Sequence, residues 1–336
     1  MQGYPLSVQT TYQDLLEMLK LRAISDIGGA PMLKTMGTSG YWYARKRVGH
    51  RVVDRYLGRD TPELRVRLDQ SQKIRAEQAT LDEKCSICVA QLRAAGVPSL
   101  DRETGKVLRA LEQSGTFRLG GTLVGTHAFR LYAAELGVPL QSVFAVTQDV
   151  DIAAFENLKL VINDQADPAL VDTFRDLGLK PAPGLDPKHR PTRWVTSGGG
   201  AIVDFLVPRM QDETDIVFLP PLGVYAQALS FLNYLLAEPI YAAGLYRSGI
   251  LVQVPRPQRY AIHKLIVAQR RTADTAAKAR KDLAQAEILV RVLAEDRPYD
   301  LKLAYEEALA MGPKWRTEIE RSLKQRSEIA EILRQL

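Results

Sequence analysis

The sequence predicts an α/β fold with a mixed sheet, flanked by helical regions at both ends of the chain. Short apolar runs bounded by glycine and proline, which predict buried strands, gather between residues 115 and 258. Helical patterns dominate the chain on either side of this stretch. We therefore divide the sequence into a helical extension at 1–114, a core at 115–258 and a C-terminal helical region at 259–336.

The extension carries clear helix start and stop signals. Residues 11–26 have the pattern of an amphipathic helix. Thr61 as N-cap and Pro62 at the first helical position predict a long helix that runs to about Ala95, where glycine and proline follow. Residues 101–114 predict one more helix, which leads into the core.

A basic, aromatic segment within the extension, residues 41–59, is predicted to form a hairpin that turns at Gly49 and His50. Aromatic side chains among cations suit stacking on unpaired bases and contacts to phosphates. The alternative is that the aromatic side chains pack on their own domain while the charges are solvated. The candidate RNA contacts are Tyr41, Trp42, Tyr43, Arg45, Lys46 and Arg47.

The core begins with a predicted strand, turn and helix. Residues 117–124 read as an interior strand that includes two glycines, and residues 127–136 read as a helix. Backbone N–H groups at a helix N-terminus favour phosphate. Gly125 would let the backbone approach a triphosphate closely, and the Thr126 hydroxyl would add a donor. The alternative is a structural turn that binds nothing.

A second predicted strand, residues 143–152, carries Asp149 and Asp151. Residues two apart on a strand face the same side, so these carboxylates lie side by side, where they repel each other. A divalent cation between them would account for this arrangement. Mg²⁺, or Mn²⁺ in its place, is the expected cofactor, because Mg²⁺ commonly takes one or two carboxylates together with substrate phosphates.

A third carboxylate, Asp204, interrupts the apolar run at 201–207. This run and residues 193–197 flank a triple glycine and predict a hairpin. If the strand of Asp204 neighbours that of Asp149, three carboxylates meet on one face, enough for two metal ions that drive in-line phosphoryl displacement. The alternative is a surface residue of an edge strand.

Further elements complete the expected secondary structure. Residues 222–236 are apolar enough for either a helix or a strand. A helix at 168–177, a strand at 250–254 and C-terminal helices are expected, the last at 259–271, 273–295, 301–311 and 314–336.

These motifs resemble the polymerase-β-type nucleotidyltransferase superfamily. The residues that carry the resemblance are Gly125-Thr126, Asp149-Val150-Asp151 and Asp204. Within that superfamily, VGTHAFRLY and TQDVDIA are most similar to a bacterial nucleotidyltransferase-fold family, and more distantly to the AbiEii-type abortive-infection toxins. The resemblance covers roughly residues 115–295. It implies a nucleotidyltransferase core in which Asp149, Asp151 and Asp204 bind metal and act in catalysis.

The toxin-like relatives also imply nucleotide-binding residues in the C-terminal region. They carry a helix whose lysine reaches the nucleotide phosphates, followed by a basic-Asp-Leu segment that opens another helix. Lys264 and the run Lys281-Asp282-Leu283 resemble these features. The alternative for each cation is a solvated basic helix face.

The resemblance implies a metal-dependent enzyme that moves a nucleoside monophosphate from an NTP to an acceptor. The basic hairpin and the toxin-like relatives favour RNA, tRNA in particular, as the acceptor. A protein acceptor is the alternative, and a toxin role would add an antitoxin as partner. A third hypothesis is a non-catalytic module that binds nucleotide or RNA.

Composition places limits on these hypotheses. The net charge of +6 and the pI near 9.2 are modest for a nucleic-acid binder, although the cations cluster in the hairpin. The sequence has no apolar run long enough to span a membrane and no signal peptide, so we expect a cytoplasmic protein. Cys85 and Cys88 form one CxxC, too few ligands for a zinc site, and are expected to be buried thiols.

Overall fold

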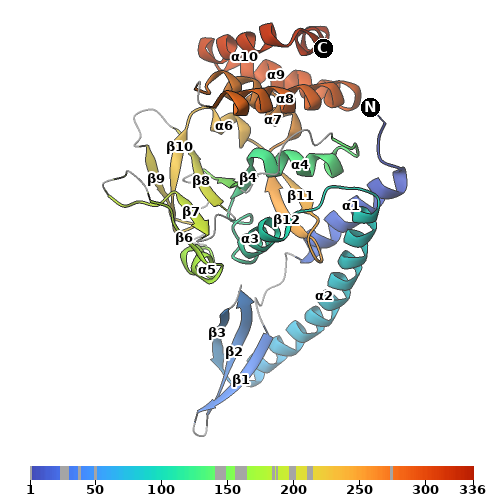
Figure 1. Cartoon of the computed structure of the whole chain (residues 1–336). Helices are drawn as coiled ribbons and strands as arrows, with labels where there is room; N and C mark the ends of the chain where they lie inside the picture. Colours follow the sequence, from blue (N-terminus) through green and yellow to red (C-terminus); the bar gives the residue numbers. More distant parts are fainter. Residues whose placement is uncertain are drawn as a thin grey trace.

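The structure is a computed structural model of the whole chain. It describes residues 2–22, 30–36, 39–48, 51–140, 149–155, 165–183, 186, 188–196, 202–209, 215–272 and 275–336. Figure 1 shows a central layer of strands, with the C-terminal helices packed above it and an N-terminal arm that extends below. The predicted α/β class with a mixed sheet and flanking helices is confirmed.

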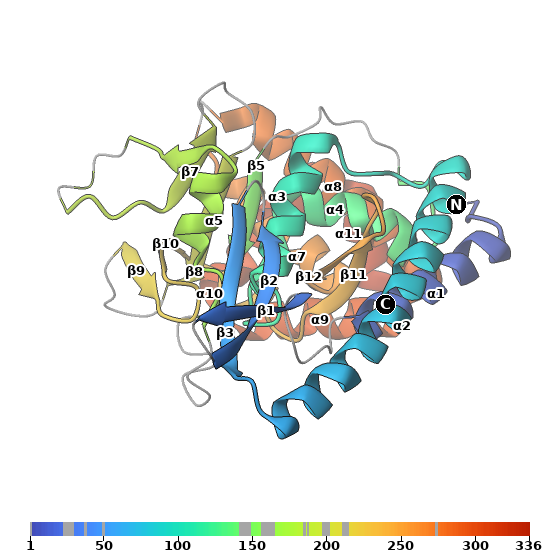
Figure 2. The ribbon, with the colours of Figure 1, turned by 90° about the horizontal axis from the view of Figure 1, so that it is seen from below.

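The N-terminal arm combines a small sheet with two helices. Strands β1 (Ala30–Met36), β2 (Ser39–Val48) and β3 (Arg51–Arg59) form one antiparallel sheet in that order. The predicted hairpin strands are thus confirmed as β2 and β3, and the predicted turn at Gly49 and His50 lies outside the described residues. Strand β1 is an additional strand that the sequence did not indicate. Figures 1 and 2 show this sheet on the lower side of the molecule, at the N-terminal end of α2.

Helix α2 (Pro62–Ala94) begins and ends where the sequence predicts. Thr61 caps its first turn, because the Thr61 hydroxyl accepts a hydrogen bond from the amide of Leu64 at 3.3 Å. Its C-terminal half packs on α1 (Leu6–Arg22) through a compact apolar cluster. Cys85 is buried in that cluster and Cys88 is half-buried, and both are free thiols.

The core starts with α3 (Arg102–Gln113), the helix predicted at 101–114, and Asp101 caps its first turn. The expected strand at 117–124 is wrong over most of its length, since β4 covers only Thr122–Val124. The amide of Gly121 donates to the carbonyl of Thr116 at 2.9 Å, so the chain winds through tight turns first. A Cβ on Gly121 would lie 2.8 Å from that carbonyl oxygen, which explains the glycine there.

The main sheet has the order β4-β5-β8-β10-β9, with β7 joined to β8 and β6 to β7. Strand β8 is parallel to its neighbours β5 and β10, and the other pairs are antiparallel, so the sheet is mixed. The strands are β5 (Asp149–Ala153), β6 (Leu179–Pro181), β7 (Arg193–Thr196), β8 (Ile202–Pro208), β9 (Ile216–Leu219) and β10 (Val224–Leu229).

The predicted hairpin around the triple glycine is confirmed as the antiparallel pair β7 and β8. The glycines at 198–200 lie outside the described residues, as do residues 143–148 of the expected strand at 143–152. The helix predicted at 168–177 is α5 (Leu170–Asp176). The apolar stretch at 222–236 holds both structures that were considered, β10 and then the short helix α6 (Leu232–Leu235).

The last third of the chain is mostly helical. A two-stranded sheet, β11 (Ile240–Gly244) and β12 (Ile250–Val254), precedes it. The helix expected at 314–336 is two helices, because Arg326 has non-helical φ and ψ of −137° and 77°. The helices are α7 (Pro257–Gln269), α8 (Ala276–Asp296), α9 (Pro298–Ala310), α10 (Pro313–Gln325) and α11 (Ser327–Gln335).

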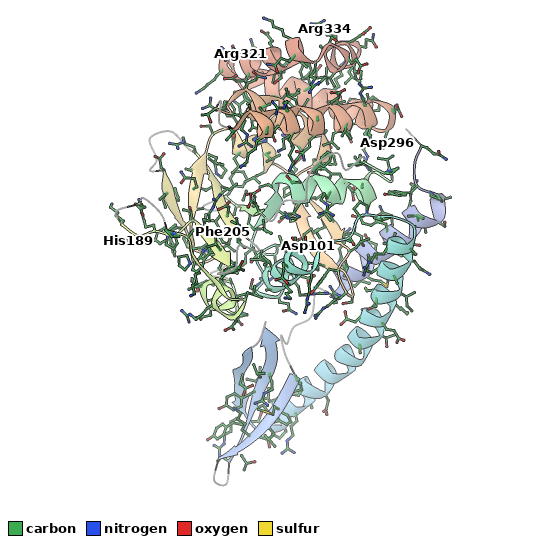
Figure 3. All side chains as sticks on the ribbon, in the orientation of Figure 1. Asp101, His189, Phe205, Asp296, Arg321 and Arg334 are labelled. Carbon is green, nitrogen blue, oxygen red and sulfur yellow. The ribbon has the colours of Figure 1, made fainter. Side chains whose placement is uncertain are left out.

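One large apolar core joins the main sheet to these helices. It contains Tyr132 of α4 (Gly125–Glu135), Phe205 of β8 and Tyr260 of α7, all of which are fully buried. Figure 3 shows Phe205 on the strand at the centre of the sheet. The C-terminal helices therefore pack directly against the elements that follow the Gly125 turn. In the part of the chain that is described, no helix has the length and apolar character needed to cross a membrane.

Candidate active site

Strand pairing brings the predicted carboxylates together. Strand β5 lies between β4 and β8, and Asp151 is opposite Val124 on one side and opposite Asp204 on the other. Directly paired residues of neighbouring strands share a face, so the Asp151 and Asp204 carboxylates are neighbours. Asp149 lies two residues before Asp151, on that same face.

The turn at Gly125 lies against this carboxylate cluster. Gly125 has φ of +67°, and a Cβ there would fall inside van der Waals contact of Asp151 Oδ2 and 3.3 Å from its Cγ. Only glycine fits both the backbone conformation and the space. Helix α4 begins here, and both Gly125 and Thr126 are partly exposed at its N-terminus. The first backbone amides of α4 therefore lie close to the Asp151 carboxylate.

The electrostatics of Asp151 reflect its crowded surroundings. Burial and the neighbouring charges of Asp204 and Asp149 raise its pKa to about 7, although Lys264 and Arg193 act in the opposite direction. Partial burial of adjacent carboxylates is unfavourable without a positive partner. The site is therefore suited to a cation or to a proton.

Asp204 already has a positive partner. The guanidinium of Arg193, directly across the β7–β8 pair, donates to both of its carboxylate oxygens at 2.6 and 2.7 Å. The Asp204 side chain is 14% exposed and that of Arg193 is 53% exposed. With Arg193 in this position, no group of three or more Asp, Glu, His or Cys side chains within the described ranges is arranged to hold a metal ion.

The C-terminal helices supply cations above the carboxylates. Lys264 of α7 is buried and its Nζ lies 2.5 Å from Asp282 Oδ1, while Arg271 Nε lies 3.0 Å from Asp282 Oδ2. Lys264 also lies over the ring of Tyr260, whose hydroxyl donates to the Gly125 carbonyl at 2.8 Å. Helix α7 is thus tied to the turn beside Asp151.

The family model described as Nucleotidyltransferase matches residues 102–310. The chain belongs to the nucleotidyltransferase family. The matched stretch contains every site residue named above, and it extends beyond the predicted core of 115–258 on both sides. The predicted resemblance to a nucleotidyltransferase superfamily is confirmed, while the distant likeness to AbiEii-type toxins stays a prediction.

The N-terminal arm of this nucleotidyltransferase matches a different family model. A domain of unknown function, DUF6788, matches residues 12–66, which span most of α1, the three-stranded sheet and the start of α2. No curated protein matches the chain. No solved structure matches it either.

Lys281, the remaining predicted nucleotide contact, lies within the electrostatic influence of the carboxylates. Its pKa is lowered by burial and by the charges of Lys264 and Lys278, and Asp282 and Asp149 oppose this effect. The alternative of a solvated helix face is wrong for Lys264, which is only 8% exposed. The nucleotidyltransferase therefore places two lysines of its C-terminal helices around the Asp149–Asp151 end of β5.

The basic hairpin is largely engaged with itself. The Trp42 indole donates to Asp60 at 2.8 Å, and Arg45 forms a double hydrogen bond with Asp54. Lys34 of β1 lies over the Tyr43 ring, 4.6 Å from its centre. For Trp42 and Tyr43 the structure favours the alternative of packing within the domain, while the Arg45 side chain is 46% exposed beside Asp54. Tyr41 is half-buried, and the side chains of Lys46 and Arg47 lie outside the described residues.

Sequence reasoning missed Arg193, Asp282 and Tyr260 as partners in the site. For Arg193 a partial signal existed, because a hairpin that turns within the triple glycine brings residue 193 close to residue 204, its observed partner. Asp282 was identified only as part of a resemblance, and its role as the buried counter-ion of two cations depends on the packing of α7 on α8. Tyr260 carries no local signal, because its hydrogen bond to Gly125 joins segments 135 residues apart.

We expect Asp282→Asn to destabilise the nucleotidyltransferase by about 3 kcal/mol, because it leaves the buried Lys264 charge without a carboxylate. Burial alone would raise the Asp282 pKa, but Lys264 and Arg271 hold it below its ordinary value. This contribution is fully present above the unfolded pKa near 4 and is lost progressively as the pH falls from there through the lower pKa of the folded state. Urea unfolding of both proteins at pH 3.5 and 7 measures it. A stability difference of equal size at the two pH values would contradict this assignment.

Proposed function

We propose that the protein transfers a nucleoside monophosphate from an NTP to a hydroxyl or phosphate oxygen of an acceptor. The acceptor oxygen bonds to the α-phosphorus as the bond between this phosphorus and the β-phosphate oxygen breaks. Pyrophosphate leaves with that bonding pair, and Asp204 accepts the acceptor's proton where one is present. The observation that best supports this is the pairing of Asp151 with Asp204 beside the N-terminus of α4.

In this proposal the chain itself mainly positions and neutralises charge. The amides at Gly125 and Thr126 and the cations of Lys264 and Lys281 hold the triphosphate. The donor set fits Mg²⁺ or Mn²⁺, because Asp149 and Asp151 are adjacent carboxylates and their repulsion contributes to the raised Asp151 pKa. Such an ion, held by Asp149, Asp151 and finally Asp204, would neutralise negative charge on the reacting phosphates.

RNA, tRNA in particular, is the acceptor that we propose. The β1–β3 sheet supports this choice, because it projects from the catalytic core on α2 and is rich in lysine and arginine. Phosphate contacts from such a surface would hold a long polyanion while its end reaches the core. A cytoplasmic location follows in this proposal, since tRNA and NTPs are cytoplasmic solutes. A toxin-like role is part of the same proposal, because it follows from the resemblance to the AbiEii-type toxins.

The decisive experiment incubates the protein with each α-labelled NTP, Mg²⁺ or Mn²⁺, and total bacterial RNA. An Asp149→Ala, Asp151→Ala double variant is the control. Label that appears on RNA and vanishes with the variant supports the proposal and identifies the base. Label on a protein instead would move the acceptor assignment to a protein partner. NTP binding without any label would leave a non-catalytic binding module as the better explanation.

The hairpin has its own test. We expect replacement of Arg45, Lys46 and Arg47 by Gln to lower RNA labelling by about tenfold at physiological salt, because each phosphate contact strengthens binding electrostatically. The rate should recover as the salt concentration falls. The matched control replaces Lys314, Arg316 and Lys324 of α10, on the far side of the core. Unchanged RNA labelling by the hairpin variant would remove this sheet from the acceptor site.

A further inference from the structure

The cation nearest to Asp204 is part of the protein itself. Arg193 and Asp204 are register partners on β7 and β8, and the guanidinium engages both carboxylate oxygens. Its hydrogen bonds to Asp204 raise the Arg193 pKa, and the charges of Asp149 and Asp151 raise it further. All three carboxylates of the candidate site therefore act on this one guanidinium.

This arrangement is incompatible with a divalent cation at Asp204. Both oxygens accept hydrogen bonds from Arg193, and the positive guanidinium would repel a second cation placed beside them. The Arg193 side chain, however, is about half exposed, so solvent is available to it when it rotates away from Asp204. A guanidinium also matches the geometry of phosphate oxygens as well as that of a carboxylate.

We propose that Arg193 is an internal counter-ion for Asp204 and that it moves to the phosphates of an incoming nucleotide. Asp204 is then free to bind a divalent cation. The proposal rests on the proposed function and adds an order to it. Without nucleotide, Asp204 is closed to metal. With nucleotide, Arg193 moves to the phosphates and the three carboxylates become available together, so that metal and nucleotide bind cooperatively.

A structural role alone would give a different result. An arginine that only bridges two strands would affect thermal stability and leave metal binding unchanged. The chain offers a matched control in Arg190, which lies three residues before Arg193. The Arg190 guanidinium donates to both carboxylate oxygens of Asp186. Arg193→Lys keeps the charge but cannot form the two parallel hydrogen bonds, so it should give an intermediate effect.

The test measures Mn²⁺ binding to the purified chain by electron paramagnetic resonance, which detects free Mn²⁺. Titrations are made alone and with each α,β-methylene analogue of ATP, GTP, CTP and UTP, and the Mn²⁺ that each analogue binds in the absence of protein is measured and subtracted. We expect the analogue to strengthen Mn²⁺ binding to the wild type. We expect Arg193→Gln to bind Mn²⁺ about fivefold more tightly than the wild type without nucleotide. Arg190→Gln should match the wild type, and Asp204→Asn in the Arg193→Gln background should remove the gain.

The outcomes separate the two proposals. Equal Mn²⁺ affinities of the wild type and Arg193→Gln, with nucleotide-dependent Mn²⁺ binding intact, would overturn the role of Arg193 alone. A gain that persists after Asp204→Asn would do the same, because the extra ion would then bind elsewhere. Absence of Mn²⁺ binding to every variant even with nucleotide would overturn the metal-dependent function, and the role of Arg193 with it.

Discussion

Asp151→Asn is expected to lower nucleotidyl transfer by about 10³-fold while it makes the folded protein more stable. The activity falls because the variant removes a carboxylate at the centre of the cluster that would hold a divalent cation, and that cation would neutralise negative charge on the reacting phosphates. The stability rises because Asn removes a partly buried charge that Asp204 and Asp149 repel. We expect a gain of about 1–3 kcal/mol at pH 8, measured by urea unfolding with EDTA present.

The difference in stability between the wild type and Asp151→Asn should depend on pH. The pKa of Asp151 is raised from 3.8 to about 7 in the folded protein, so its ionisation favours the unfolded state. The wild type should therefore lose stability relative to Asp151→Asn as the pH rises from about 4 to about 7, with the difference constant above that range. Asp172→Asn is the control, because this half-exposed residue of α5 lies outside the carboxylate cluster and forms an ion pair with Arg175. A variant less stable than wild type at pH 8 would contradict the account of Asp151.

Local signals in the sequence were sufficient for much of the fold. Thr61 and Pro62 were sufficient to predict the start of α2, because a cap depends on residues within one turn. That Asp149 and Asp151 share one face followed from the alternation of side chains along a strand. The same reasoning failed at 117–121, where an apolar stretch with two glycines winds through turns because Thr116 takes the Gly121 amide.

The candidate site divides in the same way. Gly125, Asp149 and Asp151 could be identified because their residue types conflict with an ordinary strand or turn, and such local conflicts often mark functional positions. The ion pairs of Arg193 with Asp204 and of Lys264 with Asp282 depend on which strands and helices are neighbours. That information lies in the packing of distant segments, so composition and periodicity did not reveal it. Asp204 could be identified from its own strand, but its partner Arg193 could not.

Gly125→Ala is expected to impair both stability and activity. The position has φ of +67°, which costs an L residue about 1 kcal/mol, and the added Cβ would collide with Asp151 Oδ2. Strand β5 and the start of α4 must then separate, and we expect a total loss of about 3 kcal/mol of unfolding free energy. Transfer should fall by about 10²-fold or more, because the carboxylate and the helix amides no longer share one geometry. Thermal unfolding and NTP labelling measure the two effects.

Gly178→Ala separates backbone strain from collision. Gly178 follows α5 with φ of +74°, close to that of Gly125, but a Cβ there would meet nothing within 4 Å. It should therefore lose only about 1 kcal/mol of stability and keep its full transfer rate. If both variants lose the same stability and neither loses activity, the contact between Gly125 and Asp151 is unimportant. A loss of activity confined to Gly125→Ala, beyond what its stability explains, would identify this turn as the point where the strand carboxylates and the nucleotide phosphates meet.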